Sequence, residues 1–314
     1  MAARILAVGE SIMDVVVGPD GSHAHPGGSP ANIAYGLARL GHEVSLLTAL
    51  ADDDFGRALA EHLEGAGVEV LDASWSAERT STATATIGGD GAARYDFDVS
   101  WSIPDGAVVP PASILHSGSI AAFLEPGASA VEALFAAERA RSLLSLDPNI
   151  RPALVGDHAD ALARFERLAG LADVVKLSDE DADWLYPGLS VEDAAHRIRD
   201  LGPLCVAVTR GAEGALLVSA SALVSVPGRK VEVADTIGAG DSFMSALLHV
   251  IAAELDASTT DTPDARLDVD AWRAAEAFDE RMLARLGDVA VRCAAITCSR
   301  PGANPPTAAE LAAS

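Results

Sequence analysis

The residues best suited to chemistry lie in the segment VADTIGAGDSF, residues 233–243, which runs into an apolar helical stretch. Gly238, Ala239 and Gly240 allow a tight backbone turn that points successive amide groups in one direction. These amides and the positive end of the following helix form a binding site for a phosphoryl group. Asp241 falls in the first helical turn, where a negative charge is favoured, and is placed to accept a proton from an attacking hydroxyl. The segment therefore predicts phosphoryl transfer to an alcohol, with Asp241 as the base.

The segment GGSPANIA, residues 27–34, has the residue types of a binding loop that opens a helix. Gly27 and Gly28 permit close approach of the backbone to a ligand. Asn32 offers both a donor and an acceptor to a pair of sugar hydroxyls. The segment therefore predicts part of a polar ligand site.

The helix that carries Asn32 has signals at both ends. Ser29 is expected to cap it, Pro30 fits its first turn, and Gly41 is expected to end it. Its apolar face is formed by Ile33, Leu37 and Leu40. This face should pack against the core.

Short apolar runs alternate with helical periodicity along the chain, which predicts an α/β fold with a mostly parallel sheet. The runs that read as central strands are 5–8, 44–48, 114–117, 143–146, 174–177 and 205–209. Helices are expected at 128–142, 159–169 and 191–201. In such a sheet the ligand crevice lies beyond the carboxyl ends of the strands, which is where Asp147, Asn149 and Arg151 fall.

Residues 80–98 have a different pattern. Polar and apolar residues alternate over 80–87, GGDG at 88–91 makes a turn, and 92–97 continue as a second strand. An isolated hairpin is marginally stable, so it must cover or pair with something. We expect a β lid over a binding cleft, and a homodimer formed through its free strand edges. His23 and His25 are expected in a solvated loop.

The 314 residues carry a formal net charge of −24, and 49% of them are hydrophobic. Residues 1–314 are expected to form a single domain with a sizeable core. The acidic excess argues against nucleic acid and against an anionic membrane surface as partners. No signal peptide and no apolar span of about 18 residues is recognisable, so a cytoplasmic location is expected. The acidic stretch 256–275 is expected to be a surface loop that runs into a helix.

These motifs together resemble those of the PfkB, or ribokinase-like, family of carbohydrate kinases over roughly residues 4–308. Segment 233–243 resembles the second signature of the family. Segment 27–34 resembles the first, although Ala51 stands where the family has a glycine. The resemblance implies a three-layer α/β/α fold with a mostly parallel central sheet and a small β lid. It also implies an ATP-dependent sugar kinase.

The resemblance assigns several residues to the sugar. Asp14, in the motif GESIMD at 9–14, looks like the sugar-contacting aspartate of the family. The substrate-binding residues it implies are Asp14, Gly27, Gly28, Asn32 and Arg151.

On the nucleotide side, the resemblance implies contacts from separate segments: Ser178, Thr209, Gly211, Gly214, Gly240 and Asn304. Asp181 stands where the family usually has glutamate, and is expected to act on Mg²⁺ through a water molecule. A monovalent cation, with K⁺ as the candidate, would be held by Asp235 and by the carbonyl groups of Ile237 and Gly302. The implied small molecules are ATP, Mg²⁺ and a small free sugar.

Fructose is the leading sugar, because GGSPANIA, HSGSI, DPNIRP, KLSDED and SRPGANPP together resemble bacterial fructokinases most. Ribose and 2-keto-3-deoxygluconate remain open as substrates. An adenosine-type nucleoside kinase also remains open, because aromatic residues near the hairpin offer surfaces for a base: Trp75, Tyr95, Phe97 and Trp101. A non-catalytic sensor on the same fold would be expected to lack Asp241 or the glycine turn, and both are present.

Overall fold

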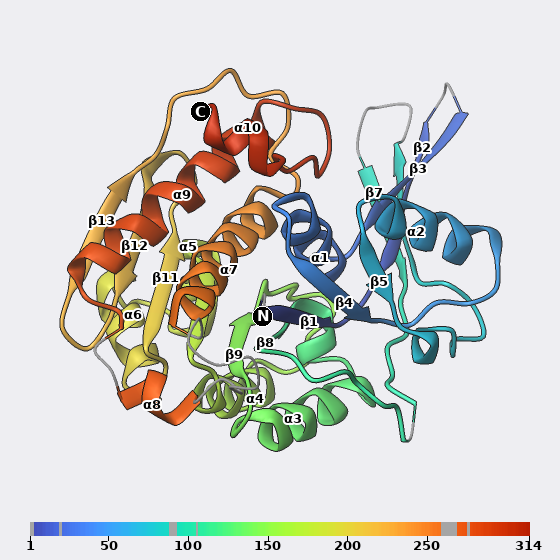
Figure 1. Cartoon of the computed structure of the whole chain (residues 1–314). Coiled ribbons are helices and arrows are strands. Elements are labelled where there is room, and N and C mark those ends of the chain that lie inside the picture. Colours follow the sequence, from blue (N-terminus) through green and yellow to red (C-terminus); the bar gives the residue numbers. More distant parts are fainter. Residues whose placement is uncertain (1–2, 19–20, 88–92, 105, 259–268, 275–276) are drawn as a thin grey trace.

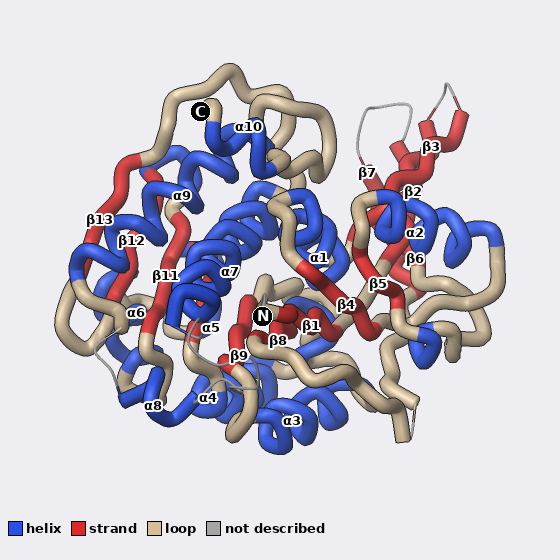
Figure 2. The backbone as a smooth tube through the Cα atoms, viewed as in Figure 1, coloured by secondary structure: helices blue, strands red, loops and turns tan. Residues whose placement is uncertain are grey.

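A computed structural model describes residues 3–18, 21–87, 93–104, 106–258, 269–274 and 277–314. Its centre is a nine-stranded sheet with helices on both faces (Figures 1 and 2). The strands are β1 (Arg4–Val8), β4 (Glu43–Leu47), β5 (Val68–Val70), β8 (Ile114–Gly118), β9 (Leu143–Asp147), β10 (Val174–Ser178), β11 (Cys205–Thr209), β12 (Gly214–Val218) and β13 (Leu223–Pro227). Their spatial order is β13-β12-β11-β10-β9-β8-β1-β4-β5.

The sheet is parallel from β5 across to β11, and β12 and β13 extend it antiparallel at one edge. Every central strand predicted from the apolar runs is confirmed, to within one residue at each end. Such runs predict strands well here because both faces of a parallel sheet are buried and every position then favours an apolar side chain.

Two layers of helices cover the sheet. One face carries α1 (Ser29–Arg39), α7 (Ala239–Ser258) and α9 (Glu280–Cys298), and the other carries α3 (Gly127–Glu138), α4 (His158–Leu171), α5 (Asp179–Leu185) and α6 (Val191–Arg199). Alternate residues of each strand face the two cores: Ile5 and Ala7 point to the first layer, and Leu6 and Val8 to the second. Within the described residues, no helix combines the length and the apolar character needed to cross a bilayer.

A separate four-stranded sheet lies to one side of the central sheet (Figure 1). Its strands are β2 (Ile12–Gly18), β3 (Gly21–Gly27), β6 (Thr82–Ile87) and β7 (Ala93–Asp98), in the order β3-β2-β6-β7. The predicted 80–98 hairpin is present as β6 and β7, and the predicted turn at 88–91 falls outside the described residues. The helix α2 (Asp54–Gly65) packs on this sheet through Leu59 and Ala60, which contact Met13.

Half of this second sheet was not anticipated. The prediction that His23 and His25 lie in a loop is wrong, because both are on β3, paired with Val16 and Asp14 of β2. Their side chains are exposed, as expected. Strands are predicted from alternating apolar residues, and β3 lacks this alternation because most of its residues are polar or glycine.

The N-cap of the first helix lies one residue earlier than expected. Gly28, with a φ of 99°, is the N-cap, and Ser29 is the first helical residue, so the prediction that Ser29 caps the helix is wrong. Pro30 lies in the first turn, and Gly41, with a φ of 91°, follows the last turn, as predicted. Ser29 has a different hydrogen-bond partner, described below.

Two short helices lie outside the layers, α8 (Val269–Ala274) before α9 and α10 (Ala308–Ala312) after it. The first is the helix expected at the end of the acidic stretch 256–275, most of which falls outside the described residues. Arg273 on α8 pairs with the buried carboxylate of Asp173 through two hydrogen bonds, of 2.7 Å from Nε and 2.8 Å from Nη2. Asp173 also accepts the amide of Leu144 on β9. The pair therefore attaches α8 to the amino-terminal edge of the sheet.

We expect Arg273→Leu to lower the free energy of unfolding by about 2 kcal/mol, because it removes two charged hydrogen bonds to a buried carboxylate and leaves Arg139, 3.8 Å away, as its cationic neighbour. The matched control is Arg285→Leu, which removes a half-exposed pair with Glu254 and should cost less than about 1 kcal/mol. Urea denaturation followed by circular dichroism measures both. Equal, small losses for the two variants would contradict the assignment.

Candidate active site

A cavity of about 880 Å³ lies at the carboxyl ends of the central strands, between the large sheet and the four-stranded sheet. Ten of the residues predicted from the sequence line it: Asp14, Gly28, Asn32, Arg151, Asp235, Ile237, Gly238, Gly240, Asp241 and Gly302. They come from positions spread over most of the chain. The topology places these segments together because the parallel strands of the central sheet all end at the same edge.

Asp241 lies buried in the first turn of α7, as predicted. Its Oδ1 accepts a hydrogen bond of 2.6 Å from the Ser29 hydroxyl, and its Oδ2 accepts one of 2.8 Å from the Asn32 amide. Both donors are on α1. The carboxylate is thus held in one orientation by a second helix, and each oxygen can accept a further hydrogen bond.

The turn before α7 has the geometry expected of an anion site. Gly238 has a φ of 73°, and a Cβ there would lie 2.6 Å from the Cβ of Ala303, so glycine is required on both counts. Within the described residues, the amides of Gly238 and Gly240 have no hydrogen-bond acceptor. Two unused amides at a helix N-terminus form a site for a phosphate oxygen.

Asp235 joins this turn to the loop at 301–303. Its carboxylate accepts the amide of Ile237 at 3.0 Å and the amide of Gly302 at 2.9 Å. These hydrogen bonds lower the pKa of Asp235, which remains charged. The three residues predicted to hold a monovalent cation are therefore adjacent, and the cation itself remains a prediction.

The four-stranded sheet contributes the opposite wall. Asp14 on β2 lies beside Gly27, where a Cβ would come within 2.2 Å of the carboxylate Oδ2, so Gly27 leaves room for that carboxylate. Burial in the cavity raises the pKa of Asp14, and the positive charges of His25 and Arg151 oppose this. Apolar contacts come from Ala83, Ala85 and Phe97.

Arg151 borders the cavity after the end of β9. Its Nη1 donates to the carbonyl groups of Asn149 at 3.3 Å and Ile150 at 3.0 Å. Asn149 has a φ of 36°, a strained value for a residue with a side chain, as is common beside binding sites. The guanidinium thus remains on the cavity side with donors left for a ligand.

Of the residues expected on the nucleotide side, Gly240 lines this cavity and the other five lie outside its walls. Ser178 and Thr209 are register partners at the ends of β10 and β11, and Asn304 follows the 301–303 loop. Gly211 is exposed, and Gly214 is required by packing, since a Cβ there would meet the Val226 carbonyl at 2.0 Å. Their contacts to a nucleotide remain predictions.

Asp181 has a structural task in the described chain. Its carboxylate accepts the amide of Ile150 at 2.8 Å, and both the amide and the hydroxyl of Ser178, which closes the N-terminal capping box of α5. Three hydrogen bonds leave little capacity for a direct metal contact. The predicted action on Mg²⁺ through water remains a prediction, and these contacts favour the capping role.

Sequence reasoning missed several polar residues of the cavity wall, among them Glu10, Ser29, Ser119 and Lys176. Glu10 follows β1, and its Oε2 accepts the amide of Ala121 at 2.9 Å. Burial raises the pKa of Glu10 to about 7, against the lowering effect of its hydrogen bonds to Ser119 and Ala121. A charged residue at the end of an otherwise apolar strand was the signal that could have identified it.

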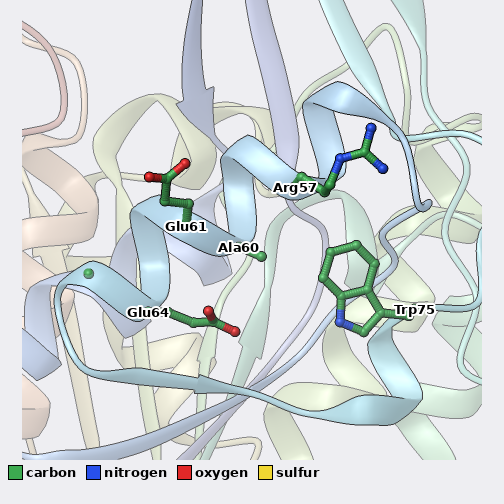
Figure 3. Close-up of a pocket in the computed structure, with 6 residues that line it drawn as sticks. Arg57, Ala60, Glu61, Glu64 and Trp75 are labelled. Atoms are coloured by element: carbon green, nitrogen blue, oxygen red, sulfur yellow. The ribbon is translucent and has the colours of Figure 1, made fainter.

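A second hollow, of about 460 Å³, lies on the outer face of α2 (Figure 3). Its walls are formed by Arg57, Ala60, Glu61, Glu64 and Gly65 of α2 together with Trp75. It is open to solvent, and none of the residues predicted to bind the sugar, the nucleotide or a metal lines it. The larger cavity at the strand ends is therefore the candidate active site.

The raised pKa of Glu10 predicts a pH-dependent stability. The protonated form is favoured in the folded chain, so the contribution is fully present below pH 4.5 and is lost as the pH rises through about 7. The neutral variant Glu10→Gln should lack this loss. Between pH 5 and 8, the stability of the wild type should fall relative to the variant by about 1–3 kcal/mol, measured by urea denaturation. Parallel pH profiles would show that Glu10 titrates normally.

Comparisons with known proteins agree with this geometry. The family model for pfkB family carbohydrate kinases matches residues 2–310. A fructokinase of Rhizobium leguminosarum bv. trifolii is 34% identical over 283 residues, covering 86% of this chain and 85% of that protein. Fructokinase-1 of Oryza sativa subsp. japonica is 32% identical over 302 residues, covering 91% and 87%.

Solved structures show the same fold. One is a double mutant of the fructokinase of Vibrio cholerae O395 with fructose, ADP and a potassium ion bound, with a TM-score of 0.79, 27% identity and coverage of 100% of this chain and 99% of that one. Another is the aminoimidazole riboside kinase of Salmonella enterica with aminoimidazole riboside and an ATP analogue, with a TM-score of 0.78, 26% identity and coverage of 99% of both chains. With the family signatures in place around one cavity, this chain belongs to the PfkB family of carbohydrate kinases.

Proposed function

We propose that this chain is a fructokinase, which transfers the γ-phosphoryl group of ATP to a primary hydroxyl of fructose. The observation that carries the proposal is the position of Asp241, held by Ser29 and Asn32 beside the glycine turn and facing the same cavity as Asp14. The curated relatives named above support fructose as the substrate, since they are named fructokinases.

The chemistry follows from the positions of these groups. The sugar binds between Asp14 and Asn32, on opposite walls of the cavity. Asp241 accepts the proton of the primary hydroxyl as its oxygen forms a bond to the γ-phosphorus, and the bond from that phosphorus to the bridging oxygen of ADP breaks. The amides of Gly238 and Gly240 stabilise the negative charge on the phosphoryl oxygens.

The sheet β3-β2-β6-β7 is proposed to act as the lid. It supplies Asp14, Ala83, Ala85 and Phe97 to the cavity wall, so its approach encloses the sugar. Enclosure excludes water, which would otherwise compete with the sugar for the phosphoryl group. We further propose a homodimer through the free edges of this sheet, whose outer strands are β3 and β7, and a cytoplasmic location.

A magnesium ion, when bound with ATP, supplies positive charge to the phosphates. Asp181 is the carboxylate proposed to act on it. It would act through water, because its oxygens already accept three protein hydrogen bonds. We also propose a potassium ion beside Asp235 and Gly302, which lie in contact. The fructokinase structure that contains a potassium ion supports this proposal.

A second candidate is a nucleoside kinase. The aminoimidazole riboside kinase of Salmonella enterica has a similar structure, and the exposed ring of Phe97 at the cavity wall could stack on a base. The small side chains of Ala83 and Ala85 on the same wall do not discriminate between a sugar and a nucleoside. An activity assay therefore has to distinguish fructose from a nucleoside as the acceptor.

A coupled assay of ADP release tests the substrate, with fructose, ribose, 2-keto-3-deoxygluconate, adenosine and aminoimidazole riboside as acceptors. We expect kcat/KM to be at least about tenfold higher for fructose than for any other acceptor, since a site built to bond several hydroxyls discriminates against analogues that leave them unpaired. A higher value for ribose or for a nucleoside would replace the proposal with that activity.

The base is tested by Asp241→Asn. An amide cannot take the proton, so kcat should fall by about 10²–10⁴-fold while fructose and ATP still bind, as measured by calorimetry. Ser29→Ala is the matched control, because it removes one hydrogen bond to the carboxylate and keeps the base, and it should lower kcat by about tenfold. Turnover near the wild-type value in Asp241→Asn would remove the assignment.

A further inference from the structure

Lysine is rare in this chain. Only Lys176 and Lys230 are present among the 22 lysine and arginine residues. Lys230 is exposed after β13, whereas Lys176 is on the central strand β10 and is 4% exposed. Almost all basic residues of this chain are arginines, and one of its two lysines is buried. An ammonium group is costly to desolvate at such a position.

The Lys176 ammonium lies beside the anion site. A Cβ at Gly240 would be 2.9 Å from Nζ, so the ammonium lies against the first turn of α7. Lys176 also lines the cavity together with Gly238, Gly240 and Asp241. The compact ammonium fits this space, and a planar guanidinium is larger.

Asp147 on β9 holds the ammonium in place. Its Oδ2 accepts a hydrogen bond of 2.9 Å from Nζ, and both side chains are buried. Burial lowers the pKa of Lys176, but the charges of Asp147, Asp241 and Asp181 outweigh it and raise the pKa overall. The lysine is therefore charged at neutral pH.

The surroundings of the pair leave some of its polar atoms without a protein partner. The neighbouring His116 ring is neutral, because burial and the Lys176 charge lower its pKa to about 3. Within the described residues, the Oδ1 of Asp147 has no hydrogen-bond partner, and Nζ bonds to Asp147 with one of its three donors. A buried ion pair contributes little net stability compared with apolar side chains of the same size, so a ligand is the better explanation for the spare donors.

We propose that Lys176 is a catalytic residue that donates a hydrogen bond to the phosphoryl group in transit from ATP to the sugar, at the turn of Gly238 and Gly240. This inference rests on the proposed function for the origin of the phosphoryl group. Negative charge is spread over the equatorial oxygens of that group in the transition state, and a fixed ammonium in a water-poor site stabilises it. In a chain with a net charge of −24, Lys176 and Arg151 are the strongly basic side chains on the cavity wall.

The competing explanation is that Lys176 only neutralises Asp147. The variants Lys176→Met, Asp147→Asn and the double variant Lys176→Met/Asp147→Asn separate the two, because the double variant removes the buried charges together. Lys230→Met is the matched control, since it deletes the other lysine of the chain, which is exposed and does not line the cavity. Thermal melting shows that each variant is folded.

If Lys176 contacts the phosphoryl group, kcat should fall by about 10²–10³-fold in both Lys176→Met and the double variant, with a smaller change in KM for the sugar. Asp147→Asn, which keeps the ammonium, should retain more activity than either. Lys230→Met should match the wild type. If Lys176 is only a counter-ion, the double variant should recover to within about threefold of the wild type, and this would overturn the proposal.

Nucleotide binding gives a readout that does not depend on the sugar. The dissociation constants of ATP and ADP, measured by calorimetry without sugar, should show that loss of Lys176 weakens ATP binding about tenfold more than ADP binding. Asp147→Asn should keep the wild-type ratio. An unchanged ratio in both lysine variants would also overturn the proposal. A wild-type protein that fails to phosphorylate fructose would instead refute the proposed substrate, and this ratio would still test Lys176.

Discussion

The chemistry of this protein depends on the packing of α1 against α7. Asp241 is directed by the Ser29 and Asn32 side chains of α1, and the two helices are close enough for this because small residues meet between them. A Cβ at Gly36 would lie 2.6 Å from the Ser245 hydroxyl. That hydroxyl donates to the carbonyl groups of Ile33 and Asp241, so one serine ties the two helices together one turn below the base.

Electrostatics set the second constraint. The chain is strongly acidic, and the site must nevertheless receive the phosphates of ATP. Backbone amides at the start of α7 supply partial positive charge without adding a side chain, and Lys176 adds a full charge at the floor of the same site. The buried acids around it, Asp147 and Glu10, have raised pKa values, so the low-dielectric interior limits how much negative charge accumulates there.

The four-stranded sheet provides what the central sheet alone lacks, a wall opposite the strand ends. Its strands come from two separate parts of the chain, 12–27 and 82–98, and the parallel pairing of β2 with β6 joins them. Asp14 reaches the cavity only because β2 leaves the central sheet directly after β1. Membership of the PfkB family and the geometry of this wall together account for a site that encloses a small polar molecule.

The local sequence determined the central strands, the glycine turn at 238–240 and the position of Asp241 in a helical turn, because each depends on neighbouring residues alone. It also determined the family, through motifs that need no coordinates. Tertiary structure decided the rest. The Ser29 hydroxyl could serve either a helix cap or a distant carboxylate, and only the approach of α7 gave it to Asp241. The strand β3 has exposed polar residues and forms because β2 pairs with it, which no local pattern indicates. In the sequence, Lys176 has no feature that separates it from other strand residues. The fold places its ammonium 2.9 Å from the position of a Cβ on Gly240. These two residues are 64 positions apart, and contacts at such a separation depend on the topology of the fold.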